Sequence, residues 1–143
     1  MSREKVAKRY ERGQSLVELA ISFTFLMILL AGTVDLGHGL FTWLALRDAA
    51  QEGASYGSIN PIDTGGMRAR IYDNLEQIIN DPPSNVVINI SIITQPCLGN
   101  TIQVDVDYPN FPITMPFLGT LLGSQTFPIH ATVNDTILIP TCE

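Results

Sequence analysis

Hydrophobic side chains dominate the chain from residue 14 to residue 34, and no polar stripe of the width found on a surface helix interrupts them. Leu19–Val34 contains no charged residue, and Glu18 is the only charged side chain between Leu16 and Asp35. A helix that spans a bilayer needs about 20 mostly apolar residues. The stretch Gln14–Val34 therefore predicts a membrane-spanning helix that has Glu18 near one end.

Helical character is expected to continue beyond the apolar run, to about Tyr56. Small residues recur there at every fourth position, at Ala45, Ala49, Gly53 and Gly57. Residues at this spacing share one helical face and permit close backbone approach. This face is expected to pack on the protein's own head or on another subunit, although an Ala-rich helix without a packing role fits the pattern nearly as well. Glycines lower helix propensity, so a flexible or kinked section is expected around Gly32, Gly37 and Gly39.

The pattern changes after the long helix. Ser58–Gly66 has the composition of a linker, and Met67–Asn80 has the spacing of an amphipathic helix that ends at two prolines. Apolar and polar residues then alternate with a period of two in three segments, centred on Ile90, Val104 and Ala131. Tyr108–Ser124, rich in Pro, Gly and Leu, is expected to be a long connection.

These elements predict an α+β fold: a long N-terminal transmembrane helix, then a small head in which one helix covers an antiparallel sheet of three to four strands. Three parts are expected. Residues 1–13 form a cytoplasmic basic leader, residues 14–57 a long hydrophobic helix that spans the membrane in its first half, and residues 58–143 an extracytoplasmic head.

Charge supports this division and gives it a direction. Residues 1–13 hold five basic and two acidic side chains, a net charge of +3, whereas the other 130 residues hold three basic and twelve acidic ones, a net charge of −9. A basic flank before a span stays in the cytoplasm, so the protein is expected in the cytoplasmic membrane with a single pass. Its overall charge of −6 argues against nucleic acid as a partner. A cleaved secretory signal peptide fits poorly, because small residues are not well placed after the apolar run.

The junction between leader and span suggests processing. A carboxylate inside the edge of a membrane helix is costly and marks a functional site. A cut after Gly13 would free an amino group on Gln14, one helical turn from Glu18, and that group would be mostly protonated at neutral pH. Glu18 would then pair with this cation or with that of a neighbouring subunit and set helix register. The simpler interpretation is a hinge at Gly13 and a snorkelling carboxylate at Glu18.

With this junction the chain resembles the TadE-like family of pseudopilins, which belong to tight-adherence (Tad or Flp) pilus systems and are type IV pilin-like. Further matches are the blocks Val34-Asp35-Leu36-Gly37 and Asp48-Ala49-Ala50-Gln51-Glu52-Gly53-Ala54. The resemblance implies a minor pilin or pseudopilin that acts in pilus assembly. It also implies a prepilin peptidase, other pilin-like subunits and the membrane assembly complex as partners, together with the lipid bilayer. Gln14 departs from the Phe of standard type IV pilins, so N-methylation is not expected.

Other candidate chemistry is sparse, and neither an enzyme nor a cofactor or metal site is expected. Cys97 and Cys142 form an even pair in an extracytoplasmic head, which supports one disulfide. Asp35 and His38, one turn apart, are expected to form a hydrogen-bonded pair rather than a metal site. Asp63-Thr64-Gly65 matches the tripeptide of aspartic proteases but has the composition of a turn. The alternative function is an uncleaved, signal-anchored binding module with Asp107–Ser124 as its contact surface.

Overall fold

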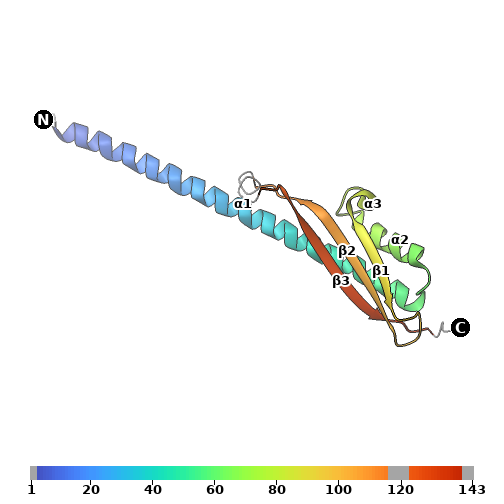
Figure 1. Ribbon diagram of the computed structural model, residues 1–143. Helices are drawn as coiled ribbons and strands as arrows, with labels where there is room; N and C mark the ends of the chain where they lie inside the picture. The colour runs from blue at the N-terminus through green and yellow to red at the C-terminus, as the bar shows by residue number, and fades with distance from the viewer. Residues whose placement is uncertain (1–2, 116–122, 140–143) are drawn as a thin grey trace.

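One long helix organises the molecule. The computed structural model describes residues 3–115 and 123–139, and its first element is α1, Arg3–Ile59, with 57 residues. At 1.5 Å per residue the helix is about 86 Å long. Its first half projects alone from the rest of the protein (Figure 1). Because the sequence has no proline before Pro61, nothing stops the helix until Asn60-Pro61 restricts the backbone.

The continuity of α1 corrects one expectation. The helix begins at Arg3 and so includes the described part of the basic leader. It runs without interruption through Gly32, Gly37 and Gly39, where a flexible or kinked section was predicted. Two of these glycines have a different use, because they lie beneath side chains of the head, as described below.

Two short helices follow. α2 is Thr64–Leu75 and α3 is Pro82–Asn85. The predicted helix Met67–Asn80 is thus displaced toward the N-terminus. It starts earlier because the carboxylate of Asp63 accepts a hydrogen bond from the Gly66 N–H at 2.9 Å and caps the first turn. It ends earlier because the backbone tightens, with both the Ile78 and Ile79 N–H groups donating to the Leu75 carbonyl.

The three strands form one antiparallel sheet in the order β1-β2-β3. They are β1 Val87–Ile93, β2 Thr101–Pro112 and β3 Thr126–Thr136. The period-two pattern predicted all three, and the α+β class is confirmed. The predicted connection Tyr108–Ser124 is too long, because β2 continues to Pro112 past a bulge between Tyr108 and Phe111. Pro109 lies in that bulge, which is where a strand tolerates proline.

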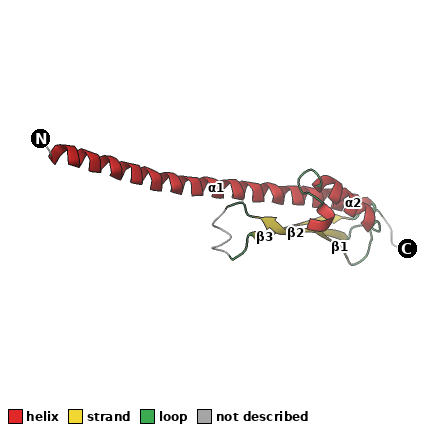
Figure 2. Ribbon diagram, turned by 90° about the horizontal axis from the view of Figure 1, so that it is seen from above, coloured by secondary structure: helices red, strands yellow, loops and turns green. Residues whose placement is uncertain are grey.

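The core lies between the sheet and the second half of α1, with α2 beside α1 on the same face of the sheet (Figure 2). Each strand turns alternate residues inward. Most of the predicted apolar positions are buried: Ile88, Ile102, Val104, Val106, Ile129, Ala131 and Val133. Ile90, Ile92 and Tyr108 are half-buried, and Phe127 is exposed. The helix contributes Leu46 and the alanines near it. The head is therefore a two-layer unit built onto the helix.

Candidate functional site

The N-terminal half of α1 carries large apolar side chains in the open. Residues Leu16, Leu19, Phe23, Phe25, Leu29 and Leu30 are each more than half exposed. By length and composition the part Gly13–Ile59 contains one candidate membrane span, and none of its apolar window is buried in the protein. The hydroxyls of Thr24 and Thr33 donate to the Ala20 and Leu29 carbonyls at 2.8 and 2.9 Å. These polar groups are thus satisfied within the helix, as a lipid environment requires.

The predicted processing residues lie on this bare part of the helix. Gly13, Gln14 and Glu18 are all exposed and helical. An added Cβ at Gly13 would meet no atom within 4 Å. Glu18 follows Gln14 by four residues, so the two positions share one helical face. The structure thus brings the two predicted positions to one face, but the peptide bond between Gly13 and Gln14 is part of a helix.

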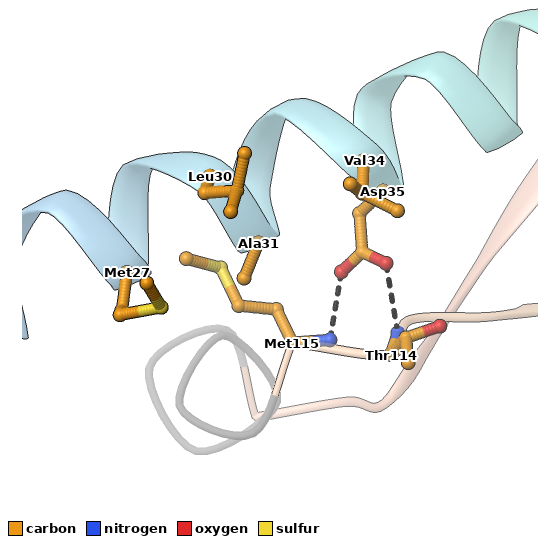
Figure 3. Close-up of a pocket in the computed structure, with 7 residues that line it drawn as sticks. All are labelled: Met27, Leu30, Ala31, Val34, Asp35, Thr114 and Met115. Atoms are coloured by element: carbon orange, nitrogen blue, oxygen red, sulfur yellow. Dashed lines mark hydrogen bonds between the residues drawn. The ribbon is translucent and has the colours of Figure 1, made fainter.

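Asp35 forms the link between the apolar half of α1 and the head. Its two carboxylate oxygens accept hydrogen bonds from the backbone N–H groups of Thr114, at 3.3 Å, and Met115, at 2.7 Å (Figure 3). The predicted pair of Asp35 with His38 is therefore wrong. The ring of His38 packs edge-on against Phe111 instead, with the centroids 5.0 Å apart.

A groove of about 280 Å³ lies beside this link. The helix contributes Met27, Leu30, Ala31 and Val34, and the end of the β2–β3 hairpin contributes Met115 (Figure 3). Two glycines let the hairpin approach the helix closely. A Cβ at Gly32 would lie 3.5 Å from Met115 Cε, and one at Gly39 would lie 3.4 Å from Phe127 Cζ.

The face of small residues packs on the protein's own head. Ala45 and Ala49 are buried, and so are the two glycines that continue their row. A Cβ at Gly53 would lie 2.6 Å from both Cδ1 and Cγ1 of Ile71, and one at Gly57 would lie 2.6 Å from Cδ1 of Ile102. The sequence predicted that this face packs on the protein's own head or on another subunit. The structure shows the first, with the face against α2 and the sheet.

Asp63 has a structural use. Besides capping α2, its carboxylate accepts a hydrogen bond from the Tyr56 hydroxyl at 2.9 Å. The Gly66 N–H and then the Tyr56 hydroxyl lower the pKa of Asp63, while the same Tyr–Asp hydrogen bond raises the pKa of Tyr56. These contacts are those of a helix cap, and they give Asp63-Thr64-Gly65 the turn role that its composition predicts.

The predicted cysteine pair and the possibility of a metal site remain to be placed. Cys97 lies in the turn between β1 and β2, whereas Cys142 lies outside the described residues, so their disulfide stays a prediction. Across residues 3–115 and 123–139, no group of three or more His, Cys, Asp or Glu side chains is placed to hold a metal ion.

Comparison with known proteins supports the family resemblance. Residues 13–55 match the family described as TadE-like protein. This part of α1 is similar to the TadE-like family, and we call it the TadE-like segment. No curated protein and no solved structure matches the chain. The TadE-like segment runs from Gly13 through the apolar half of α1 and Asp35 to the helix face beneath the head.

Sequence reasoning missed the partners of Asp35. This residue belongs to the acidic-apolar-Gly block that carries part of the resemblance, but its partners are backbone groups that lie 79 and 80 residues further along the chain. The available signal was its position, because a lone carboxylate at the end of an apolar run needs hydrogen-bond donors. Nothing in the sequence showed that the hairpin would supply them.

Proposed function

We propose that this protein is a minor pilin or pseudopilin of a Tad-type pilus that is processed after Gly13 and acts in pilus assembly at the cell envelope. The TadE-like match that begins at Gly13 carries the proposal. The bare apolar half of α1 supports it, because such a surface needs lipid or other helices around it. No catalytic residue is assigned, since the role is one of assembly.

The proposed topology follows from charge and length. The leader, with a net charge of +3, remains in the cytoplasm, and the head lies on the other side of the membrane. Gln14 and Asp35 are 21 residues apart, or about 32 Å along a helix. This distance matches a hydrocarbon core of about 30 Å. Gln14 and Asp35 then lie at the inner and outer boundaries of the membrane.

Cleavage by a prepilin peptidase would change the inner boundary. The new amino group of Gln14 carries a positive charge at neutral pH, and it lies one turn from the Glu18 carboxylate. The Glu18 carboxylate of one subunit could also pair with the Gln14 amino group of a neighbouring helix. Such a pair would fix the position of the two helices along their axes. The peptidase must first unwind the helix at the scissile bond, and glycine makes that local unwinding less costly.

Mass spectrometry of protein extracted from membranes tests the cut. The mature chain should begin at Gln14, and Gly13→Ala should accumulate as the full-length precursor. The fold accepts the added methyl group, because nothing lies within 4 Å of it. Gly37→Ala is the matched control, with equally empty surroundings, and it should be processed normally. A native chain that keeps residues 1–13 would refute the proposal and favour a signal-anchored binding module.

A second experiment tests the role of Glu18 in assembly. Glu18→Gln keeps the size of the side chain and removes the charge, so this variant should be cleaved normally but recover fewer pilin-like subunits when it is purified from membranes. Glu52→Gln is the control, because Glu52 is an exposed carboxylate on the head half of the same helix. Equal recovery of subunits with Glu18→Gln and with wild type would contradict the role in register.

A further inference from the structure

We propose that the described end of the β2 side of the β2–β3 hairpin, residues 113–115 (the hairpin end), is a second membrane-contact element, which enters the outer leaflet beside α1 and is held there by Asp35. The inference rests on the proposed membrane insertion of α1 and adds a lipid-binding surface on the head. The occupant of the groove between Met115 and α1 is then the acyl chain of a lipid.

Depth along the helix is the first argument. If Asp35 lies at the outer boundary, every residue on its N-terminal side lies deeper. Gly32, over which the Met115 side chain packs, is about 4–5 Å deeper, and Met27 at the far end of the groove is about 12 Å deeper. The hairpin therefore places Met115 below the boundary that the helix itself defines.

Backbone hydrogen bonding is the second argument. The last pair of the hairpin that the structure describes is Ile113 N–H to the Gln125 carbonyl at 2.8 Å. The next two N–H groups, of Thr114 and Met115, both donate to Asp35. A strand end in water has no need of such acceptors, whereas backbone donors in lipid must be satisfied within the protein. Asp35 is thus a positioning residue that holds the hairpin end against the helix.

The chemistry of the surface is the third argument. The 22 residues from Tyr108 to Ile129 include no charged side chain. The groove is lined by Met27, Leu30, Ala31, Val34 and Met115, with Asp35 and Thr114 at one end. It is continuous with the bare apolar face of α1, so lipid that surrounds the helix also reaches the groove. An apolar surface at this depth is matched by acyl chains.

Fluorescence quenching by brominated lipid tests the inference. The full-length protein, with Trp43→Phe to remove the native tryptophan, would be reconstituted in phosphatidylcholine vesicles whose acyl chains carry bromine. Single tryptophans would be placed at Thr114, whose side chain is exposed, and at Met115. Phe25→Trp reports the membrane half of α1, and Leu138→Trp reports the opposite end of the head, where the Leu138 N–H donates to the Ser58 carbonyl.

Thr114→Trp and Met115→Trp should be quenched at least half as strongly as Phe25→Trp, with blue-shifted emission, and Leu138→Trp should not be quenched. Quenching at Phe25 with none at Thr114 and Met115 would overturn the inference and assign the groove to a protein partner, while the proposed function would stand. The absence of quenching at Phe25 would overturn the membrane placement itself.

The role of Asp35 has its own test in the Thr114→Trp background. Asp35→Leu removes both acceptors and keeps an apolar side chain of similar size, so quenching at position 114 should fall by about half or more. Asp35→Asn keeps one acceptor and should retain an intermediate value. Asp48→Leu is the control, because Asp48 is an exposed carboxylate on the half of α1 that carries the head. This variant should leave the quenching at position 114 unchanged. Unchanged quenching in Asp35→Leu, with Phe25→Trp still quenched, would show that the hairpin enters lipid without Asp35.

Discussion

Gly53 tests how closely the head is fitted to the long helix. The change Gly53→Ala adds one methyl group on the buried face of α1. The new Cβ would lie 2.6 Å from two atoms of Ile71 on α2. Ile71 is fully buried, so its side chain has no free volume to move into, and α1 and α2 must separate slightly.

Two opposing terms set the magnitude. Overpacking of a well-packed core costs about 1–3 kcal/mol, and replacement of glycine by alanine in a helix recovers about 1 kcal/mol. Gly53→Ala should therefore lower the free energy of unfolding by about 0–2 kcal/mol. Gly37→Ala, with no atom within 4 Å of the added methyl, gains only the helix term. The two variants should thus differ by about 1–3 kcal/mol.

Thermal unfolding in detergent micelles, followed by the fluorescence of Trp43, measures this difference. For a folded unit of the size of the head, 1 kcal/mol corresponds to about 4–8 °C in Tm. Ile71→Val removes the Cδ1 atom, so adding it to Gly53→Ala should restore part of the lost stability. The double variant should then be more stable than the sum of the two single effects predicts. A Tm for Gly53→Ala equal to or above that of Gly37→Ala would refute the close fit of α1 and α2.

Three further predictions concern the head. Asp63→Asn should lower the Tm at pH 7. The difference in Tm from wild type should shrink below about pH 4. The reason is that a carboxylate with a lowered pKa stabilises the fold only while it is ionised, and this effect is lost as the pH falls through the pKa of the folded state. Cys97→Ser and Cys142→Ser should each lower the Tm as much as reductant does, which corresponds to a loss of up to about 4 kcal/mol in the free energy of unfolding for the 46-residue loop. Peptide mapping without reductant should recover the linked pair. Arg70→Met, which breaks the half-exposed ion pair with Glu52 at 3.2 Å, should change stability in the same unfolding assay by less than about 1 kcal/mol.

The sequence predicted the elements whose signal is local. β1 was expected around Ile90 and β2 around Val104, and both strands formed there, because a period of two with one buried face fixes which residues point inward. The long helix was also predicted, because an apolar run without proline can satisfy its backbone hydrogen bonds in a membrane only as a helix.

Features that depend on distant contacts could not be predicted in this way. Gly32 and Gly39 indicated a kink, because only their helix propensity was visible. Their role is to admit Met115 and Phe127, which lie more than 80 residues away in the sequence. The extension of β2 beyond Tyr108 was hidden by Pro109, which lies in a bulge, and by Pro112, which ends the strand.

The two blocks of the TadE-like segment gain a common physical meaning from the structure. Asp35 in the first block holds the hairpin end, and Gly53 in the second block lies against α2. Both blocks are thus points where the helix contacts the head, one at the boundary of the apolar run and one near the end of α1. Two such attachments fix the head along the helix as well as around it. In the proposed pilin-like subunit, a force on the apolar half of α1 would therefore reach the head directly through these two attachments.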